Sequence, residues 1–208
     1  MNIDIQTHHG ESLAAEIGKL SEFRLRYFRE YPYLYAGMEE HVQKYDAEQK
    51  YIARYIADPT ARLILVRDMD ADGEIVGIAI GTMLSYEQEI LRQASEQLYR
   101  YGIVPEQFFY FGEMIFVPEY RNKGLGRQTL KTLKNAGKEQ GCSRFCFLAV
   151  DREPNDVRRP VGYVDSEMIF QKFGFEKTDI AVSFDWPTVQ ADGSVKTVAN
   201  RLAFWVDR

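Results

Sequence analysis

Residues 108–149 constrain the fold of this chain most, because they combine an apolar run, a glycine-rich turn and an amphipathic pattern. The run FFYFGEMIFV at 108–117 is almost wholly apolar and aromatic, as expected of a strand buried on both faces. Pro118 ends it, since proline has no N–H to give to a strand ladder. A helical pattern follows the turn and stops at Gly141, and residues 144–150 predict the next strand. The segment therefore predicts an α/β unit of strand, turn, helix and strand.

The turn between the first strand and the helix has the composition of a phosphate-binding turn. Gly124 and Gly126 let the backbone approach a ligand without interference from a Cβ atom. The helix that follows directs unpaired N–H groups and the positive end of its dipole toward the same place. Arg121, Lys123 and Arg127 add positive charge in a chain whose net charge is −5. These residue types favour phosphate binding over a turn in which the glycines serve only geometry.

Two other phosphate-binding loops fit this turn less well. A nucleoside-triphosphate P-loop needs Gly-Lys followed by Ser or Thr, whereas Gly126 is followed by Arg127 and Gln128. A dinucleotide fingerprint needs a third glycine where Thr129 stands. Both are therefore disfavoured.

The sequence RNKGLG at 121–126 resembles the acetyl-CoA-binding motif of the GNAT acyltransferase superfamily, Gln/Arg-x-x-Gly-x-Gly/Ala. Residues 169–175 (IFQKFGF) resemble the helix-to-strand signature of that family, Phe-Tyr-x-Lys-x-Gly-Phe, with Phe170 where the tyrosine usually stands. The resemblance covers nearly the whole chain and implies a single domain, 1–208. It implies an α/β fold with a mixed, mostly antiparallel, twisted sheet flanked by helices.

The resemblance implies acetyl-CoA as the cofactor and CoA as the product. Main-chain groups of two residues would pair with the pantetheine arm between the splayed fourth and fifth strands, and the amides of residues 122–127 would hold the pyrophosphate. The expected cofactor-binding residues are Phe116 and Val117 for the arm, then Arg121, Asn122, Lys123, Gly124, Leu125, Gly126, Arg127 and Phe170. The expected reaction is direct transfer of an acetyl group to the amine of a small molecule or a peptide.

Glu113 is the candidate base for that transfer, because the amine must lose a proton before it attacks. Apolar neighbours in the strand favour a carboxyl that takes up a proton near neutral pH. The alternative is a structural glutamate paired with an arginine. A tyrosine at the position of Phe170 lies near the CoA sulfur in the family, so Tyr163, the nearest tyrosine in sequence, is the candidate acid. For Tyr163 the alternative is an exposed loop residue.

Residues 28–37 (FREYPYLYAG) are rich in tyrosine. The connection between the first two helices commonly forms a wall of the acceptor site in the family, so Tyr31, Tyr33 and Tyr35 are candidate substrate-binding residues. An aromatic loop packed over the sheet is an equal alternative. The acceptor stays open between a polyamine, an aminoglycoside, an amino acid and a protein N-terminus.

Residue spacing predicts further elements along the chain. They are a strand at 1–5, helices at 12–28 and 40–56, a hairpin from 62–67 and 75–84, and a last hairpin from 180–189 and 195–206. Tyr45, Ile52 and Ile56 are expected among the apolar members of the second helix. A helical pattern over 86–101, with Tyr101 among its apolar positions, is inserted between the third and fourth strands. It is expected as a packing element, with a lid or a homodimer contact as alternatives.

Composition argues against several function classes. A hydrophobic content of 45% and a charged content of 27% over 208 residues fit one globular domain. The net charge of −5 argues against general nucleic-acid binding. No apolar run is long enough to span a bilayer and the N-terminus lacks a signal-like region, so a cytoplasmic protein is expected. Cys142 and Cys146 are expected as buried reduced thiols, and His8 and His9 as a solvated pair, with no metal site.

A second function class fits the same resemblance. A GNAT-fold protein could bind CoA for sensing or assembly without turnover, and the phenylalanine at position 170 leans mildly that way. Consumption of acetyl-CoA against a panel of amines separates the enzyme from the binding protein.

Overall fold

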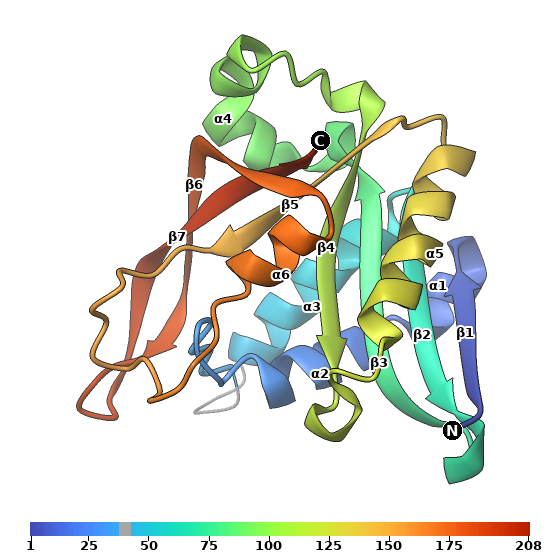
Figure 1. Ribbon diagram of the computed structural model, residues 1–208, viewed down its shortest axis with the longest axis horizontal. Helices are drawn as coiled ribbons and strands as arrows, with labels where there is room; N and C mark the ends of the chain where they lie inside the picture. Colours follow the sequence, from blue (N-terminus) through green and yellow to red (C-terminus); the bar gives the residue numbers. More distant parts are fainter. Residues whose placement is uncertain (38–42) are drawn as a thin grey trace.

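A seven-stranded sheet forms the centre of the molecule, in the order β1-β2-β3-β4-β5-β7-β6 (Figure 1). The computed structural model describes residues 1–37 and 43–208, with the side chains of 43–47 excepted. The strands are β1 (Ile3–His8), β2 (Arg62–Asp68), β3 (Glu74–Met83), β4 (Phe108–Phe116), β5 (Arg144–Val150), β6 (Phe175–Val189) and β7 (Val195–Asp207). β4 and β5 run parallel, and the other neighbouring pairs of described strands are antiparallel. The expected mixed, mostly antiparallel fold is confirmed.

Helices cover both faces of this sheet. They are α1 (Gly10–Glu16), α2 (Gly18–Tyr27), α3 (Gln43–Ile56), α4 (Gln88–Arg100), α5 (Leu125–Glu139) and α6 (Glu167–Lys172), with short 3-10 turns η1 (Met69–Ala71), η2 (Leu84–Tyr86), η3 (Pro105–Gln107) and η4 (Pro118–Tyr120). Leu13, Leu20 and Ile52 of α1, α2 and α3 are buried with Ile80 of β3 on one face. Leu133 of α5 lies in the core cluster of the opposite face. Each such buried Leu or Ile side chain contributes about 1.5–3 kcal/mol to stability.

β4 carries a β-bulge that changes which face its residues meet. The register between β3 and β4 shifts between Ile80 and Gly81, which leaves Gly112 without a partner in β3. As a result Gly112 and Glu113, although consecutive, line the same cavity. A Cβ atom on Gly112 would lie 2.6 Å from the hydroxyl of Tyr55, so only glycine fits at the bulge.

β4 and β5 separate along their length. Their parallel pairing extends from Phe108 with Arg144 to Phe111 with Phe147. β4 stays paired with β3 further along, to Phe116. Beyond the last pair the two strands diverge, and a cavity is lined from both of them. This is the splay that the family resemblance implies.

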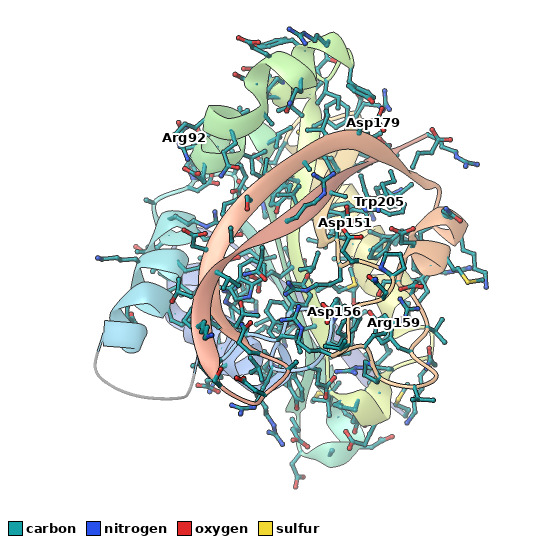
Figure 2. The ribbon with its side chains drawn as sticks, turned by 90° about the vertical axis from the view of Figure 1, so that its left-hand side faces the viewer. Arg92, Asp151, Asp156, Arg159, Asp179 and Trp205 are labelled. Carbon is teal, nitrogen blue, oxygen red and sulfur yellow. The ribbon has the colours of Figure 1, made fainter. Side chains whose placement is uncertain are left out.

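The inserted helix α4 packs along β6, an outermost strand of the sheet. Nε2 of Gln93 donates to the carbonyl of Ser183 at 2.9 Å, and Oε1 of Gln93 accepts from the N–H of Ser183 at 2.8 Å. The hydroxyl of Tyr101, just after α4, donates to Asp179 at 2.9 Å, where the curved β6–β7 ribbon passes near the helix (Figure 2). The side chain of Gln93 thus hydrogen-bonds to the N–H and the carbonyl of Ser183, with which an additional strand could otherwise pair.

Two expectations about helices are wrong. The helix expected over 12–28 is two helices divided at Ile17, because the second begins at a glycine, a weak helix former. Ile56 is 48% exposed, and Tyr55 occupies the buried face of α3 instead. The expected start of the second helix at 40–42 lies outside the described residues.

Three further expectations need correction. Tyr101 is 49% exposed, because its hydroxyl rather than its ring makes the contact with β6. β6 begins at Phe175 rather than at 180, since a bulge between Lys177 and Ala181 lets both parts pair with β7. His8 is the last residue of β1 rather than part of a loop.

Candidate active site

Two cavities border the gap between β4 and β5. The first, which we call the acidic cavity, has a volume of about 300 Å³ and is lined by Arg24, Phe28, Tyr33, Tyr35, Glu48, Tyr51, Arg54, Glu87, Ile90, Tyr110, Gly112, Glu113, Leu148, Phe184, Asp185, Trp186, Pro187 and Leu202. The second, the gap cavity, has a volume of about 240 Å³ and is lined by Tyr31, Pro32, Tyr33, Met114, Ala149, Val150, Asp151, Arg152, Tyr163, Asp165, Ser166, Glu167, Phe170, Lys177, Ala203 and Trp205. Tyr33 lines both, so the cavities approach each other there.

The two cavities lie on opposite faces of the sheet. Neighbouring residues of a strand point to opposite faces. Glu113 of β4 and Leu148 of β5 line the acidic cavity, whereas the next residues, Met114 and Ala149, line the gap cavity. A ligand that passes between the two strands can therefore reach from one cavity to the other.

The glycine turn before α5 presents free backbone amides. Gly124, the N-cap residue, has a left-handed φ of 82°. The first amide of α5 that bonds back within the helix is that of Gln128, to the carbonyl of Gly124 at 3.3 Å. The amides of residues 125–127 donate to no other described residue. The nearest atom to a Cβ placed on Gly126 is a ring carbon of Phe116 at 4.0 Å, so the space beside it is open.

The basic side chains of the turn differ in how available they are. Nε of Arg121 donates to the carbonyl of Phe116 at 3.1 Å, and its Nη1 pairs with Glu30 at 3.2 Å. Lys123 and Arg127 each lie over an aromatic ring, at 5.0 and 5.9 Å, and neither forms an ion pair with a described residue. Arg121 thus links the turn to Glu30 in residues 28–37, which we call the aromatic segment. The charges of Lys123 and Arg127 are not neutralised by a described carboxylate, so they can attract an anion.

The backbone groups of Phe116 and Val117, the two residues expected to pair with the pantetheine arm, differ in how available they are. The N–H of Val117 donates to the carbonyl of Val76 at 3.0 Å, and its carbonyl accepts from the N–H of Tyr120 at 2.9 Å. The backbone of Phe116 faces the other way, toward β5, because successive residues of a strand alternate. Its N–H is therefore directed into the gap, whereas Val117 is engaged within the protein. Asn122 has a left-handed φ of 61°, which turns the chain toward α5.

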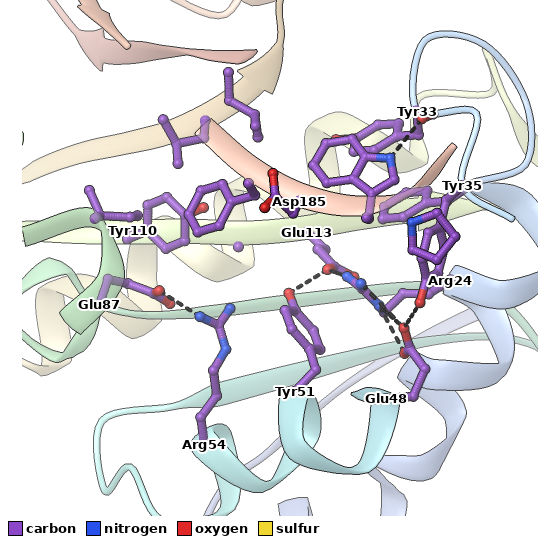
Figure 3. A pocket seen from close by; sticks show the side chains of 18 residues that line it. Arg24, Tyr33, Tyr35, Glu48, Tyr51, Arg54, Glu87, Tyr110, Glu113 and Asp185 are labelled. Atoms are coloured by element: carbon purple, nitrogen blue, oxygen red, sulfur yellow. Dashed lines mark hydrogen bonds and ion pairs between the residues drawn. The ribbon is translucent and has the colours of Figure 1, made fainter. Parts of the chain in front are cut away.

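Glu113 lies in the acidic cavity between α2 and α3 (Figure 3). Its Oε1 accepts hydrogen bonds from Arg24, with which it forms an ion pair, and from the hydroxyl of Tyr51. Arg24 also pairs with Glu48 at 3.0 Å, and Glu48 accepts from the hydroxyl of Tyr35 at 2.6 Å. Oε2 of Glu113 is buried and has no hydrogen-bond partner among the described residues. One oxygen is therefore held by an arginine, as the structural alternative expects, and the other is free to accept a proton.

A second charged group lies at the other end of the same cavity. Arg54 donates to Glu87 at 2.8 Å and to the hydroxyl of Tyr55 at 2.6 Å. The Tyr55 hydroxyl lies 3.3 Å from that of Tyr51, which donates to Glu113. Desolvation by burial raises the pKa of Glu87, and the charge of Arg54 opposes this. The side chains thus form one connected hydrogen-bond network along the cavity, joined through Tyr55. Figure 3 shows the two groups that Tyr55 joins, Arg54 with Glu87 and Tyr51 with Glu113.

Burial keeps the phenols of the acidic cavity neutral. Desolvation raises the pKa of Tyr33 to about 12 and raises the pKa of Tyr35, Tyr55 and Tyr110 above their ordinary value. A phenol with a raised pKa holds its proton at neutral pH. The charges in this cavity therefore come from its carboxylates and guanidinium groups.

The three tyrosines of the aromatic segment divide between the two cavities. Tyr31 lines the gap cavity and meets Tyr163 edge to face at 4.7 Å. Tyr33 lines both cavities, and Tyr35 lines the acidic cavity. Arg152 donates to two carbonyl groups of this segment, at 2.9 and 3.2 Å. The segment is therefore held by a loop far away in sequence and forms part of both walls.

Phe170 and Tyr163 both line the gap cavity. The ring of Phe170, on α6, lies 4.7 Å from the ring of Phe147 and 5.2 Å from that of Trp205. Tyr163 precedes α6 and is half-buried rather than exposed. Burial raises the pKa of its phenol. The gap cavity is thus lined by an aromatic surface at Phe170 and by the neutral phenol of Tyr163.

The sequence analysis did not identify several residues that line the acidic cavity. They are Arg24 on α2, Glu48, Tyr51 and Arg54 on α3, Glu87 before α4, and Asp185 and Trp186 on β6. The available signal was the placement of polar residues among apolar ones: Glu48 and Tyr51 share the helix face of Ile52 and Tyr55. Charged residues on a buried helix face need partners of opposite charge. Here Glu48 pairs with Arg24, and Arg54 pairs with Glu87.

The described residues contain no group of three or more His, Cys, Asp or Glu side chains that could hold a metal ion. None of the described helices has the length and apolar character needed to cross a membrane. Both cysteines are free and buried, as expected.

The glycine turn before α5 and the diverging parallel strands β4 and β5 agree with the GNAT fold that the sequence resembles. The model of the Acetyltransferase (GNAT) family matches residues 22–161. The chain belongs to this family. A search of curated protein sequences finds no match.

Solved structures support the same fold. A Drosophila melanogaster polyamine N-acetyltransferase that forms N-acetylagmatine has 15% identity and a TM-score of 0.59, covering 98% of this chain and 99% of that one. A mosquito arylalkylamine N-acetyltransferase-like protein has 15% identity and a TM-score of 0.58 over the same shares, 98% and 99%. An Elizabethkingia anophelis GNAT acetyltransferase with acetyl-CoA bound has 13% identity and a TM-score of 0.51, covering 100% of this chain and 98% of that one. At such identities the likeness concerns the fold alone.

Proposed function

We propose that the chain is an acetyl-CoA-dependent N-acetyltransferase that acts on an amine. The observation that carries this proposal is the arrangement at the β4–β5 gap. The gap cavity lies on one face, the acidic cavity on the other, and Tyr33 lines both. A thioester on one side and an amine on the other can thus meet between the strands, beside Glu113.

The residues present fit acetyl-CoA. The amides of residues 125–127 and the charges of Lys123 and Arg127 suit a pyrophosphate. The N–H of Phe116 suits an amide carbonyl of the pantetheine arm, and the gap cavity can take its apolar end against Phe170. When bound, acetyl-CoA supplies an activated acetyl group on a thioester.

Glu113 receives a proton in the reaction that we propose. The ammonium of the acceptor donates to the free Oε2 of Glu113 and becomes a neutral amine. The amine nitrogen then attacks the acetyl carbonyl carbon, so that a C–N bond forms and the C–S bond breaks. The nitrogen loses a second proton in this step, which balances the proton that the departing sulfur takes up. Arg24 and Tyr51 hold Oε1 and orient the carboxylate. Tyr163, with its proton retained, donates to the departing sulfur, which as a thiolate needs only modest help.

A turnover assay with a matched pair of variants tests this function. Acetyl-CoA consumption is measured with a panel of amines for the wild type, Glu113→Gln and Glu119→Gln. Glutamine keeps the shape of Glu113 but cannot take a proton, so turnover should fall roughly ten- to ten-thousand-fold while the affinity for CoA barely changes. Glu119→Gln, exposed on η4 and outside both cavities, should behave as wild type.

The rival function is a CoA-binding protein without turnover. It predicts acetyl-CoA binding with no consumption against any amine. Phenylalanine at 170, where the family has a tyrosine, favours it. Wild-type turnover in Glu113→Gln would instead leave the enzyme assignment intact and return Glu113 to a structural role.

A further inference from the structure

We propose that the acceptor amine is a small dication, an amine that carries a second positive group a short chain away. This rests on the proposed function, because it names the substrate of the same site. The inference comes from the charges of the acidic cavity, from two carboxylate groups in it that have unused acceptor capacity, and from the size of the cavity.

The described side chains that line the acidic cavity leave it with a net charge of −2. Four carboxylates line it, Glu48, Glu87, Glu113 and Asp185, against two arginines, Arg24 and Arg54, and no lysine or histidine. Arg54 and Glu87 form a neutral pair at 2.8 Å. Arg24 is shared between Glu48 and Glu113, which leaves one negative charge there. Asp185 supplies the second.

These two negative charges correspond to two carboxylates, Glu113 and Asp185, that can each accept further hydrogen bonds. Oε2 of Glu113 is buried without a hydrogen-bond partner among the described residues, and its side chain is only 5% exposed. A buried carboxylate oxygen without a donor is costly, so a ligand that donates to it gains affinity. The carboxylate of Asp185, on β6, forms no ion pair or hydrogen bond with a described residue. Asp185 is exposed, so its carboxylate borders the cavity where solvent reaches it, and Figure 3 places it on the side opposite α3.

Part of the wall of the acidic cavity is aromatic. Tyr33, Phe184 and Trp186 line it, and their ring faces attract cations and methylene groups alike. The volume of about 300 Å³ lies at the lower limit for small-molecule sites. It suits a short linear molecule and is too small for an oligosaccharide.

The negative charges of the acidic cavity also suit the changes in substrate charge during the proposed reaction. When the ammonium at Glu113 gives up its proton, that end of the site becomes neutral. The second positive group keeps its partner at Asp185, so the substrate stays bound while its reacting nitrogen is uncharged. Acetylation then converts a dication into a monocation, which the cavity holds less strongly, and product release is favoured.

Paired substrates of equal chain length test the proposal. Putrescine and cadaverine are compared with butylamine and pentylamine, which lack the second amino group, and with phenylethylamine. kcat/KM is measured for the wild type, Asp185→Asn and Asp179→Asn. Asp179 lies on the same strand but outside the cavity, where it contacts Tyr101, so it is the matched control.

The wild type should prefer the diamines. Asp185→Asn should raise the KM for putrescine about 3- to 10-fold, with kcat little changed, as expected for loss of one partly exposed ion pair. The change for butylamine should be much smaller, and Asp179→Asn should match the wild type. Equal or better turnover of butylamine or phenylethylamine by the wild type would overturn the proposal, as would an equal effect of Asp185→Asn on both amines.

Direct binding separates this inference from the proposed function. Binding of the two diamines to the CoA-loaded protein is measured by calorimetry for the same three proteins. If no amine is acetylated but a diamine binds more weakly to Asp185→Asn, the enzyme assignment fails and the dication site stands. If amines are acetylated and neither diamine binds better than its monoamine, the dication site fails and the enzyme assignment stands.

Discussion

At the scale of single residues, Arg24 controls the charge of the acidic cavity. It pairs with Glu48 and Glu113, and its guanidinium lies 3.8 Å from the centre of the Tyr51 ring. A buried pair that loses one partner typically costs about 3–5 kcal/mol, because a charge is left without compensation. Because Arg24 and Tyr51 both hold Oε1 of Glu113, Oε2 is the oxygen of that carboxylate left without a partner among the described residues.

Tyr33→Phe should make the protein less sensitive to alkaline pH. Its pKa of about 12 in the fold lies above the ordinary value of 10.0. Between these values the unfolded chain loses the phenol proton and the folded protein keeps it, so stability is full below pH 10 and falls as pH rises toward 12. At pH about 11 the folded wild type should lose about 1 kcal/mol through this group. Urea unfolding of both proteins at pH about 8 and about 11 measures it, and an equal loss in the variant would show that Tyr33 does not contribute.

At the scale of elements, the N-terminus of α5 decides cofactor binding. Gly126→Glu would place a negative side chain where the turn offers free amides. The space beside Gly126 is open, so the variant should fold. A ligand that binds only the folded state raises the melting temperature. Acetyl-CoA should therefore raise it for the wild type and not for the variant.

A matched control keeps this test specific. Gly18 begins α2 as Gly126 lies in the first turn of α5, and a Cβ atom on Gly18 meets nothing within 4 Å. Gly18→Glu should respond to acetyl-CoA like the wild type. A full temperature shift in Gly126→Glu would remove the phosphate-binding role of the turn.

The contact of α4 with β6 should stabilise the sheet edge measurably. Gln93→Ala removes two hydrogen bonds to Ser183, at 2.9 and 2.8 Å. Because these bonds lie near solvent, we expect a loss of about 1 kcal/mol in the free energy of unfolding. Gln97→Ala, exposed on the same helix, should change it by less than about 0.5 kcal/mol. Urea unfolding compares the three proteins, and equal stability of all three would show that the edge contact is neutral.

At the scale of the whole molecule, the two thiols should react only when the fold opens. Cys142 and Cys146 are 3% and 0% exposed, and burial raises the pKa of both. The thiolate is the reactive form, so labelling of the native protein should be slow and should follow unfolding. A thiol reagent should modify two groups per chain in denaturant. Rapid labelling without denaturant would show that a cavity or a fluctuation reaches the core.

The sequence predicted the strand, turn and helix that support the site better than it predicted the side chains that line the acidic cavity. The run at 108–117, the turn and the helix after it follow local rules of periodicity and turn chemistry, and the structure confirms these elements. The acidic cavity depends on contacts between distant elements. Arg24 meets Glu113 across 89 positions, and a bulge at Gly112 turns Glu113 to that face. No local pattern reports such contacts or a register shift.

We expect the early end of the β4–β5 pairing to divide the sheet into two units in hydrogen exchange. Four residue pairs, from Phe108 with Arg144 to Phe111 with Phe147, join β1–β4 to β5–β7–β6 within the sheet. Hydrogen exchange senses cooperative opening units, and a sheet joined over so short a stretch has a natural boundary between two of them. A molecule lodged between the strands would contact both units and raise the protection of both together. Exchange at amides far from the gap would then report whether the cleft between the strands is occupied.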